Sequence, residues 1–343
     1  MRKIPVASAL GAAFLFGAST PAAKTLAGDV HPVLLAGLLY AGSGFGLGLW
    51  FLAGRRKTSL RRGDLPWLLG AVICGGIIGP VLLMAGLVTT GAASASLMLN
   101  LEGVFTALLA WFAFHENFDR RIAIGMALIV AGGVLLAFEP GALQGGGYLG
   151  PLAVAGACLA WSIDNNLTRK VSSADPAAIA AIKGGVAGAV NLAIAAAIGA
   201  TWPGFTTAAA AAGVGLLGYG VSLALFVLAL RDLGAARTGA YFSTAPFVGV
   251  AIALLALGEA PSPLFWPAAA LMLAGVWLHV SERHEHRHVH EPMAHEHGHV
   301  HDEHHRHAHE FEWDGKEPHV HEHRHAKLAH RHPHYPDLHH RHH

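Results

Sequence analysis

A single carboxylate, Glu102, lies in the middle of a long apolar stretch that runs from residue 92 to residue 114. A buried carboxylate is unfavourable unless it binds something, so its position indicates a group that could hold a cation or a proton. In the competing interpretation, Glu102 is hydrogen-bonded to neighbouring helices and only stabilises the fold. Both interpretations put its side chain in the interior of the protein.

A polar stripe occurs in another apolar stretch, residues 149–168. The stripe consists of Trp161, Asp164, Asn165 and Thr168. Their spacing, i, i+3, i+4 and i+7, puts them on one face of a helix. Because a polar stripe exposed to lipid would be costly, we expect it to face a bundle interior and to line a substrate or ion pathway. Alternatively, these residues are interfacial polar groups near one helix end.

Lys183 and Asn191 share a face of the next apolar stretch, residues 177–199. Lys183 lies about six residues, or roughly 9 Å, from one end of that helix. It could therefore extend its ammonium group to the lipid headgroups, or it could pair with Asp164, which lies at a similar depth. We include Lys183 and Asn191 in the predicted pathway.

The C-terminal segment, residues 282–343, holds 23 of the 26 histidines and almost no aliphatic runs. Such a segment cannot bury a core, so we expect a disordered tail. Its His-x-His spacing suits Zn, Ni or Co, and no cofactor is otherwise required. The predicted metal ligands are His295, His297, His299, His304, His305, His307, His330, His332, His334, His339, His340 and His342. Alternatively, the segment is only a solvated polar tail.

Long apolar stretches separated by short polar breaks position all of these residues except the tail. A transmembrane helix needs about 20 apolar residues, and lipid offers free backbone groups no partner. Such stretches occur at residues 5–23, 32–53, 66–87, 92–114, 122–138, 149–168, 177–199, 208–230, 236–257 and 264–280. The sequence therefore predicts an all-α integral membrane protein with about ten transmembrane helices.

The first half of this pattern matches the second half at an offset of about 143–145 residues. Glu116, for example, aligns with Glu259. A five-helix unit has an odd number of crossings, so its copy must have the opposite orientation, which predicts inverted repeats. The expected parts are a first repeat at 1–138, a linker at 139–147, a second repeat at 148–281 and the tail at 282–343.

Basic residues are distributed asymmetrically among the predicted loops. If the N-terminus is cytoplasmic, the cytoplasmic segments hold 13 Lys and Arg residues and the opposite side holds only Lys24. This bias obeys the positive-inside rule, so we expect an inner (plasma) membrane protein with both termini in the cytoplasm. The 13 residues are Arg2, Lys3, Arg55, Arg56, Lys57, Arg61, Arg62, Arg120, Arg121, Arg169, Lys170, Arg231 and Arg237.

The ends of the two repeats resemble the EamA family of the drug/metabolite transporter superfamily. The family pattern is a stretch of small residues, an apolar run containing a Pro, and a closing Gly-Glu. The second repeat carries Gly234-Ala235-Ala236, Pro246 and Gly258-Glu259. The first repeat departs from the pattern, with Gly103 in place of the Pro and His115 in place of the Gly. The resemblance implies a transporter fold and leaves the substrate open.

Together these patterns predict a secondary transporter, acting in efflux, of a small organic metabolite or toxic solute, with a metal-binding cytoplasmic tail. The first alternative is a transition-metal exporter whose tail collects or senses the ion, and the second is a non-transporting, metal-sequestering membrane protein. The sequence contains no pairing of a nucleophile with a general base that would indicate an enzyme. It also contains no Walker A loop that would indicate ATP coupling. A net charge of +1 without a basic run does not favour nucleic-acid binding. The expected partners are the solute and membrane lipid, and a homodimer is compatible with the pattern.

Overall fold

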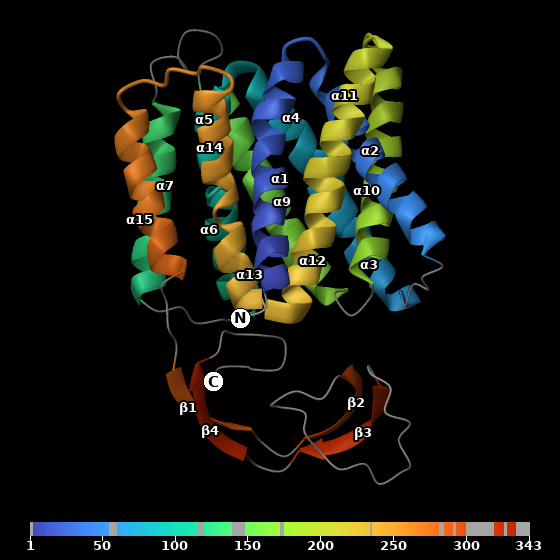
Figure 1. Ribbon diagram of the computed structural model, residues 1–343, viewed down its shortest axis with the longest axis vertical. Coiled ribbons are helices and arrows are strands. Elements are labelled where there is room, and N and C mark those ends of the chain that lie inside the picture. Colours follow the sequence, from blue (N-terminus) through green and yellow to red (C-terminus); the bar gives the residue numbers. More distant parts are fainter. Residues whose placement is uncertain are drawn as a thin grey trace. The chain divides into compact units, whose positions relative to one another are not determined.

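The structure is a computed structural model in which the chain forms two units, a body of helices and a tail that contains strands (Figure 1). In the body it describes residues 3–54, 60–114, 120–138, 148–171, 175–233 and 235–280. In the tail it describes four strands, residues 285–290, 293–299, 319–325 and 328–333. The helices of the body run roughly parallel to one another and pack side by side.

Regular structure in the described residues of the body is helical. The first half contains α1 (Lys3–Ala27), α2 (Pro32–Ala53), α3 (Leu65–Ala71), α4 (Gly79–Thr89), α5 (Ala92–Met98), α6 (Leu101–Phe114) and α7 (Arg120–Ala137). The second half contains α9 (Leu149–Lys170), α10 (Pro176–Ala197), α11 (Phe205–Gly215), α12 (Ser222–Leu233), α13 (Ala235–Phe242), α14 (Ala245–Leu255) and α15 (Phe265–Val280). The 3-10 turn η1 (Arg62–Asp64) and the π-helices η2 (Val72–Ile78) and η3 (Leu216–Val221) join some of these into longer helices.

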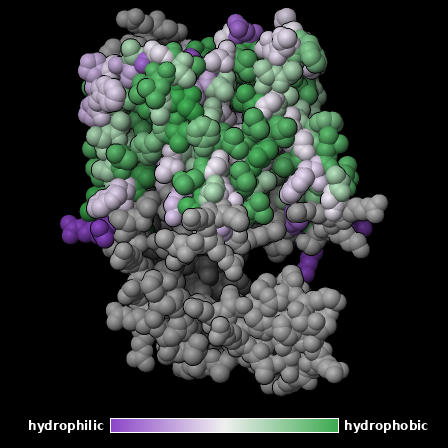
Figure 2. All heavy atoms as spheres, viewed as in Figure 1, coloured by the Kyte–Doolittle hydropathy of each residue, from purple (hydrophilic) through white to green (hydrophobic). Residues whose placement is uncertain are grey.

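The body has the apolar character of a membrane protein. Within its described residues, seven helices are long and apolar enough to cross a membrane, and α14 and α15 are apolar but shorter. Apolar residues cover most of the face seen in Figure 2, and hydrophilic residues gather near its ends. α9 falls outside the seven because Asp164 and its polar neighbours lower its hydropathy. The body is therefore an all-helical, multi-pass membrane unit, as the composition predicts.

Two of the long helices change from α to π geometry near their middle. In η2 the N–H of Gly79 donates to the carbonyl of Cys74. The next residue, Pro80, has no N–H, so the carbonyl of Gly75 lacks the donor that a π-helix would supply. η2 begins at residue 72 and η3 begins at residue 216, an offset within the range of the sequence repeat. The apolar pattern alone did not predict either π-helix.

Two further helices are interrupted, although the sequence predicts continuous helices over 92–114 and 236–257. Two residues separate α5 from α6, and two separate α13 from α14. In the first break the side-chain amide of Asn100 donates to the carbonyl of Leu97 at 2.8 Å, which satisfies a backbone acceptor where the helix ends. Glu102 therefore lies at the start of a helix and not in the middle of one.

The helices α2 and α10 approach so closely that their backbones touch. A Cβ atom added at Gly44 would overlap the backbone of Gly184 and Gly185. A Cβ atom added at Gly188 would lie 2.5 Å from the backbone nitrogen of Ala41. Small residues at such positions allow membrane helices to pack closely. Because α10 also packs on η2, this contact helps to fix the polar residues of α10 beside the π-helix.

The turn between α4 and α5 is held by two charged residues from elsewhere in the body, Lys24 on α1 and Glu259 in the loop after α14. Lys24 Nζ lies 2.5 Å from the carbonyl oxygen of Leu87, near the C-terminus of α4. The carboxylate of Glu259 accepts hydrogen bonds from the N–H groups of Ala92 at 2.7 Å and Ala93 at 2.8 Å, at the start of α5. A cation at a helix C-terminus and a carboxylate at an N-terminus both complement the helix dipole. These charges thus stabilise one end of the body.

The described part of the tail forms two antiparallel strand pairs. β1 (Glu285–His290) pairs with β4 (Leu328–Pro333), and β2 (Met293–His299) pairs with β3 (His319–His325). This pairing differs from the sequence prediction of a disordered tail. Its physical basis is the alternation of His with other residues, because a strand also has a period of two.

Candidate functional site

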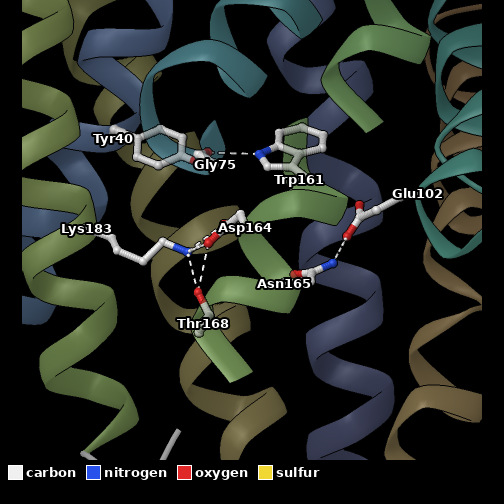
Figure 3. Close-up of polar contacts among 8 residues, drawn as sticks. All are labelled: Tyr40, Gly75, Glu102, Trp161, Asp164, Asn165, Thr168 and Lys183. Atoms are coloured by element: carbon white, nitrogen blue, oxygen red, sulfur yellow. Dashed lines mark hydrogen bonds and ion pairs between the residues drawn. The ribbon is translucent and has the colours of Figure 1, made fainter. Parts of the chain in front are cut away.

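An ion pair between α9 and α10 lies inside the body (Figure 3). Lys183 Nζ is 2.5 Å and 2.6 Å from the two carboxylate oxygens of Asp164, and the Thr168 hydroxyl donates to Asp164 Oδ1 at 2.8 Å. The Lys183 and Asp164 side chains are only 15% and 9% exposed. Each charge lowers the free-energy cost of burying the other. Lys183 therefore pairs with Asp164, the partner that its depth in the sequence suggested.

Beside this pair, the carbonyl oxygen of Gly75 in η2 accepts two side-chain hydrogen bonds. The Tyr40 hydroxyl donates to it at 2.6 Å and the indole N–H of Trp161 donates at 2.9 Å (Figure 3). These donors satisfy the carbonyl that Pro80 leaves without a backbone partner. A Cβ atom at Gly75 would overlap the carboxylate of Asp164. The glycine therefore allows α9 to bring this carboxylate against the π-helix.

Asn191, on the same helix as Lys183, contacts the next carbonyl of η2. Its side chain is completely buried, and its amide nitrogen donates to the carbonyl oxygen of Gly76 at 3.0 Å. Its own oxygen, Oδ1, is buried without a hydrogen-bond partner in the described part of the chain. An unpaired buried acceptor costs about 1–3 kcal/mol, so Asn191 offers an acceptor that a ligand could use.

The second carboxylate of the site, Glu102, contacts α9 from another side. The amide nitrogen of Asn165 donates to Glu102 Oε1 at 2.7 Å (Figure 3). The Ser162 hydroxyl donates to the backbone carbonyl of Glu102 at 2.9 Å and so ties the start of α6 to α9. Glu102 is half-buried and Asn165 is exposed, whereas Asp164 is buried. Glu102 is therefore the more accessible carboxylate.

The residues of the predicted polar stripe on α9 belong to two separate sets of contacts. Trp161, Asp164 and Thr168 contact η2 or Lys183, and Asn165 turns toward α6. Within the described residues, no Lys, Arg or His nitrogen lies within 4.0 Å of the Glu102 carboxylate. The site thus combines a neutral ion pair with a carboxylate whose described partner is a neutral amide. Such an arrangement can bind a positive charge.

Several residues of the site were missed by the sequence analysis. Tyr40, Gly75, Pro80 and Ser162 each make or create one of the contacts described above. A proline inside a helix frees a carbonyl about one turn earlier, so Pro80 was a usable signal for Gly75. Tyr40 was also detectable as one of two hydroxyl-bearing residues, with Ser43, in the apolar stretch 32–53. Ser162 gave no distinguishing signal.

The predicted metal ligands in the tail are only partly described. His295, His297 and His299 lie on β2, and His330 and His332 lie on β4. Outside the described residues lie His304, His305, His307, His334, His339, His340 and His342. No group of three or more His, Cys, Asp or Glu residues that could hold a metal ion is assembled in the part of the chain that was described.

Comparison with known proteins identifies the family of this chain. The profile of the EamA-like transporter family matches residues 3–138 and 148–281. A protein of Methanothermobacter thermautotrophicus described as an uncharacterized transporter is 29% identical over 291 residues, which are 79% of this chain and 84% of that protein. A protein of known crystal structure shares the fold, with a TM-score of 0.60 and 22% identity over 80% of this chain and 98% of that one. Because the family profile covers nearly the whole helical body, this chain belongs to the EamA-like transporter family.

Proposed function

We propose that this protein is a secondary transporter that exports a small organic metabolite or toxic solute past the polar residues around α9. The observation that carries the proposal is the presence of two carboxylates on α6 and α9 within an apolar body, Glu102 beside Asn165 and Asp164 beside Lys183. Ionisable groups are costly inside a membrane and usually mark a pathway. A purely structural role accounts for the buried ion pair, whereas Glu102 is half-buried and has no cationic partner among the described residues.

We further propose that the body crosses the membrane ten times as two inverted repeats, 1–138 and 148–281. The packing of the helices supports this, because α4 packs on α9 as α12 packs on α1, and α6 packs on α9 as α14 packs on α1. The two π-helices and the two helix breaks also fall at matching positions. Inverted repeats can rock about a shared central site and so expose it to each side in turn.

The orientation that we propose has both termini in the cytoplasm of a cell whose inner (plasma) membrane holds the protein. Single cysteines can test it after Cys74 and Cys158 have been replaced. A cysteine in the 139–147 loop should react with an impermeant thiol reagent in intact cells, and a cysteine in the tail should react only after lysis. Labelling of the tail in intact cells would contradict the inverted-repeat proposal, because ten crossings return the chain to the side where it started.

The transport proposal can be tested by efflux from cells loaded with a panel of toxic organic solutes. Glu102→Gln and Asp164→Asn should each slow efflux of the exported solute by about tenfold or more, because each removes a charge from the pathway. Asp29→Asn is the matched control, since Asp29 is an exposed carboxylate in the turn after α1. Membrane expression is measured for each variant. If both pathway variants export at the wild-type rate, the proposed pathway is wrong.

We also propose that the tail binds Zn, Ni or Co. The register of the strands supports this proposal, because it pairs histidines across β2 and β3. The paired Cα positions are His295 with His323, His297 with His321, and His299 with His319. Alternate residues of a strand lie on one face, so these six positions share a face, and imidazole is a ligand that suits these metals.

The tail proposal can be tested on the full-length protein and on a variant that ends at residue 281. Calorimetry at pH 7.5 should show several metal ions bound by the full chain and few by the shortened one. Acidification to about pH 5 should release the ions as the imidazoles are protonated. His297→Ala combined with His321→Ala should weaken binding more than either change alone. Equal binding by the full and shortened chains would exclude the tail as the metal site.

A further inference from the structure

The two carboxylates of the site have different nearest partners. Asp164 has the Lys183 ammonium at 2.5 Å, whereas Glu102 has the neutral amide of Asn165 at 2.7 Å. From this difference we propose that the transported solute is a positively charged organic molecule, such as an ammonium compound, and that Glu102 holds its charge. This inference rests on the proposed transport function and adds the charge class of the solute.

The charges of the described part of the body support a cation. Lys24 and Glu259 both lie at the end of the body that holds the α4–α5 turn, where they complement opposite helix ends. The pair of Asp164 and Lys183 has no net charge. Among the described residues, no cationic side chain contacts the Glu102 carboxyl group. A single positive charge beside it would lower the free-energy cost of keeping it in the membrane.

An anionic or zwitterionic solute fits the same site less well. The obvious group for a solute carboxylate is the Lys183 ammonium, but it already contacts both oxygens of Asp164 and lies 3.4 Å from the Thr168 hydroxyl. A solute carboxylate would have to displace Asp164 and leave its charge buried without a partner. Breaking a buried pair in this way is strongly unfavourable.

The hydrogen-bonding groups and rings of the site agree with a cation. The buried oxygen of Asn191 is an acceptor without a hydrogen-bond partner in the described residues. An ammonium group supplies up to three donors. Trp161 lies one turn before Asn165 on α9, and an indole ring is the aromatic surface that cations favour most.

The inference can be tested with three solutes of similar shape and different charge: 2-phenylethylamine, 2-phenylethanol and 3-phenylpropionate. Their binding is measured by calorimetry on the full chain in lipid nanodiscs at pH 7.5. The amine should bind about 10–100 times more tightly than the alcohol, and the acid should bind least, since only the amine can place a positive charge beside Glu102. In Glu102→Gln the amine and the alcohol should bind within about threefold of each other.

Two further variants keep the test independent of any folding defect in Glu102→Gln. Glu102→Asp retains the charge and should retain the preference for the amine. Asp29→Asn removes an exposed carboxylate outside the site and should also retain it. An equal or reversed preference in the wild type, or a preference that survives Glu102→Gln, would overturn the inference. Carrier-mediated export of uncharged or anionic solutes without any advantage for cations would overturn it too, while the proposed transport function would stand.

Discussion

The ion pair between Asp164 and Lys183 allows a quantitative prediction through a double-mutant cycle. The perturbations are Asp164→Asn, Lys183→Met and both together. At an effective dielectric constant of 20, two unit charges 2.6 Å apart attract by roughly 6 kcal/mol, and desolvation of both groups offsets much of that. Because both side chains are largely buried, surface screening does not reduce the interaction to the value of an exposed pair.

Each single variant should lose about 3–5 kcal/mol of unfolding free energy, because it leaves one buried charge without its partner. The double variant should lose less than the sum of the single losses, with a coupling energy of about 2–3 kcal/mol. The assay is an unfolding titration of the purified protein from mild detergent into dodecyl sulfate, followed by circular dichroism. Asp29→Asn with Lys183→Met is the control pair, and its effects should add. Additivity within about 0.5 kcal/mol for the buried pair as well would refute the reasoning.

Three further predictions use the same unfolding assay. Gly44→Ala should cost about 1–3 kcal/mol of unfolding free energy because its Cβ would overlap the backbone of α10. Gly48→Ala is the control and should be close to neutral, since a Cβ there meets nothing within 4 Å. Equal effects of the two changes would contradict the close packing of α2 and α10. Glu259→Gln should cost about 1 kcal/mol by weakening the cap of α5, and the loss should be smaller in high salt. Trp161→Phe should cost about 1–3 kcal/mol by removing a donor to the carbonyl of Gly75, and a neutral result would mean that the Tyr40 hydroxyl alone satisfies that carbonyl.

Part of the candidate site was predictable from the sequence because charges are rare in apolar stretches. Glu102, Asp164 and Lys183 stand out in a chain in which only 13% of the residues are Asp, Glu, Lys or Arg. Periodicity also placed Trp161 and Thr168 on the face of Asp164, and both lie there in the structure. These signals identify candidate residues because a membrane makes each polar side chain costly.

The remaining contacts could not be read from spacing. The division of the α9 stripe, with Asn165 turned toward α6, depends on which helices pack on each side of α9. The helices break between α5 and α6 and between α13 and α14 because side chains there replace backbone groups in hydrogen bonds. One such bond is donated by the Asn100 amide. Hydropathy does not reveal these bonds. The strand pairs in the tail depend on partners 20–48 residues apart, which composition does not specify.

The sequence by itself determined that this chain has an apolar helical body, because long uninterrupted apolar runs can satisfy their backbone only as helices in lipid. It also determined which few residues could do chemistry there. Only the tertiary structure decided that Lys183 neutralises Asp164 and that Glu102 meets the neutral amide of Asn165. The physical reason is that both outcomes depend on how closely α2, α6, α9 and α10 pack, and that packing is set by contacts between segments far apart in the chain.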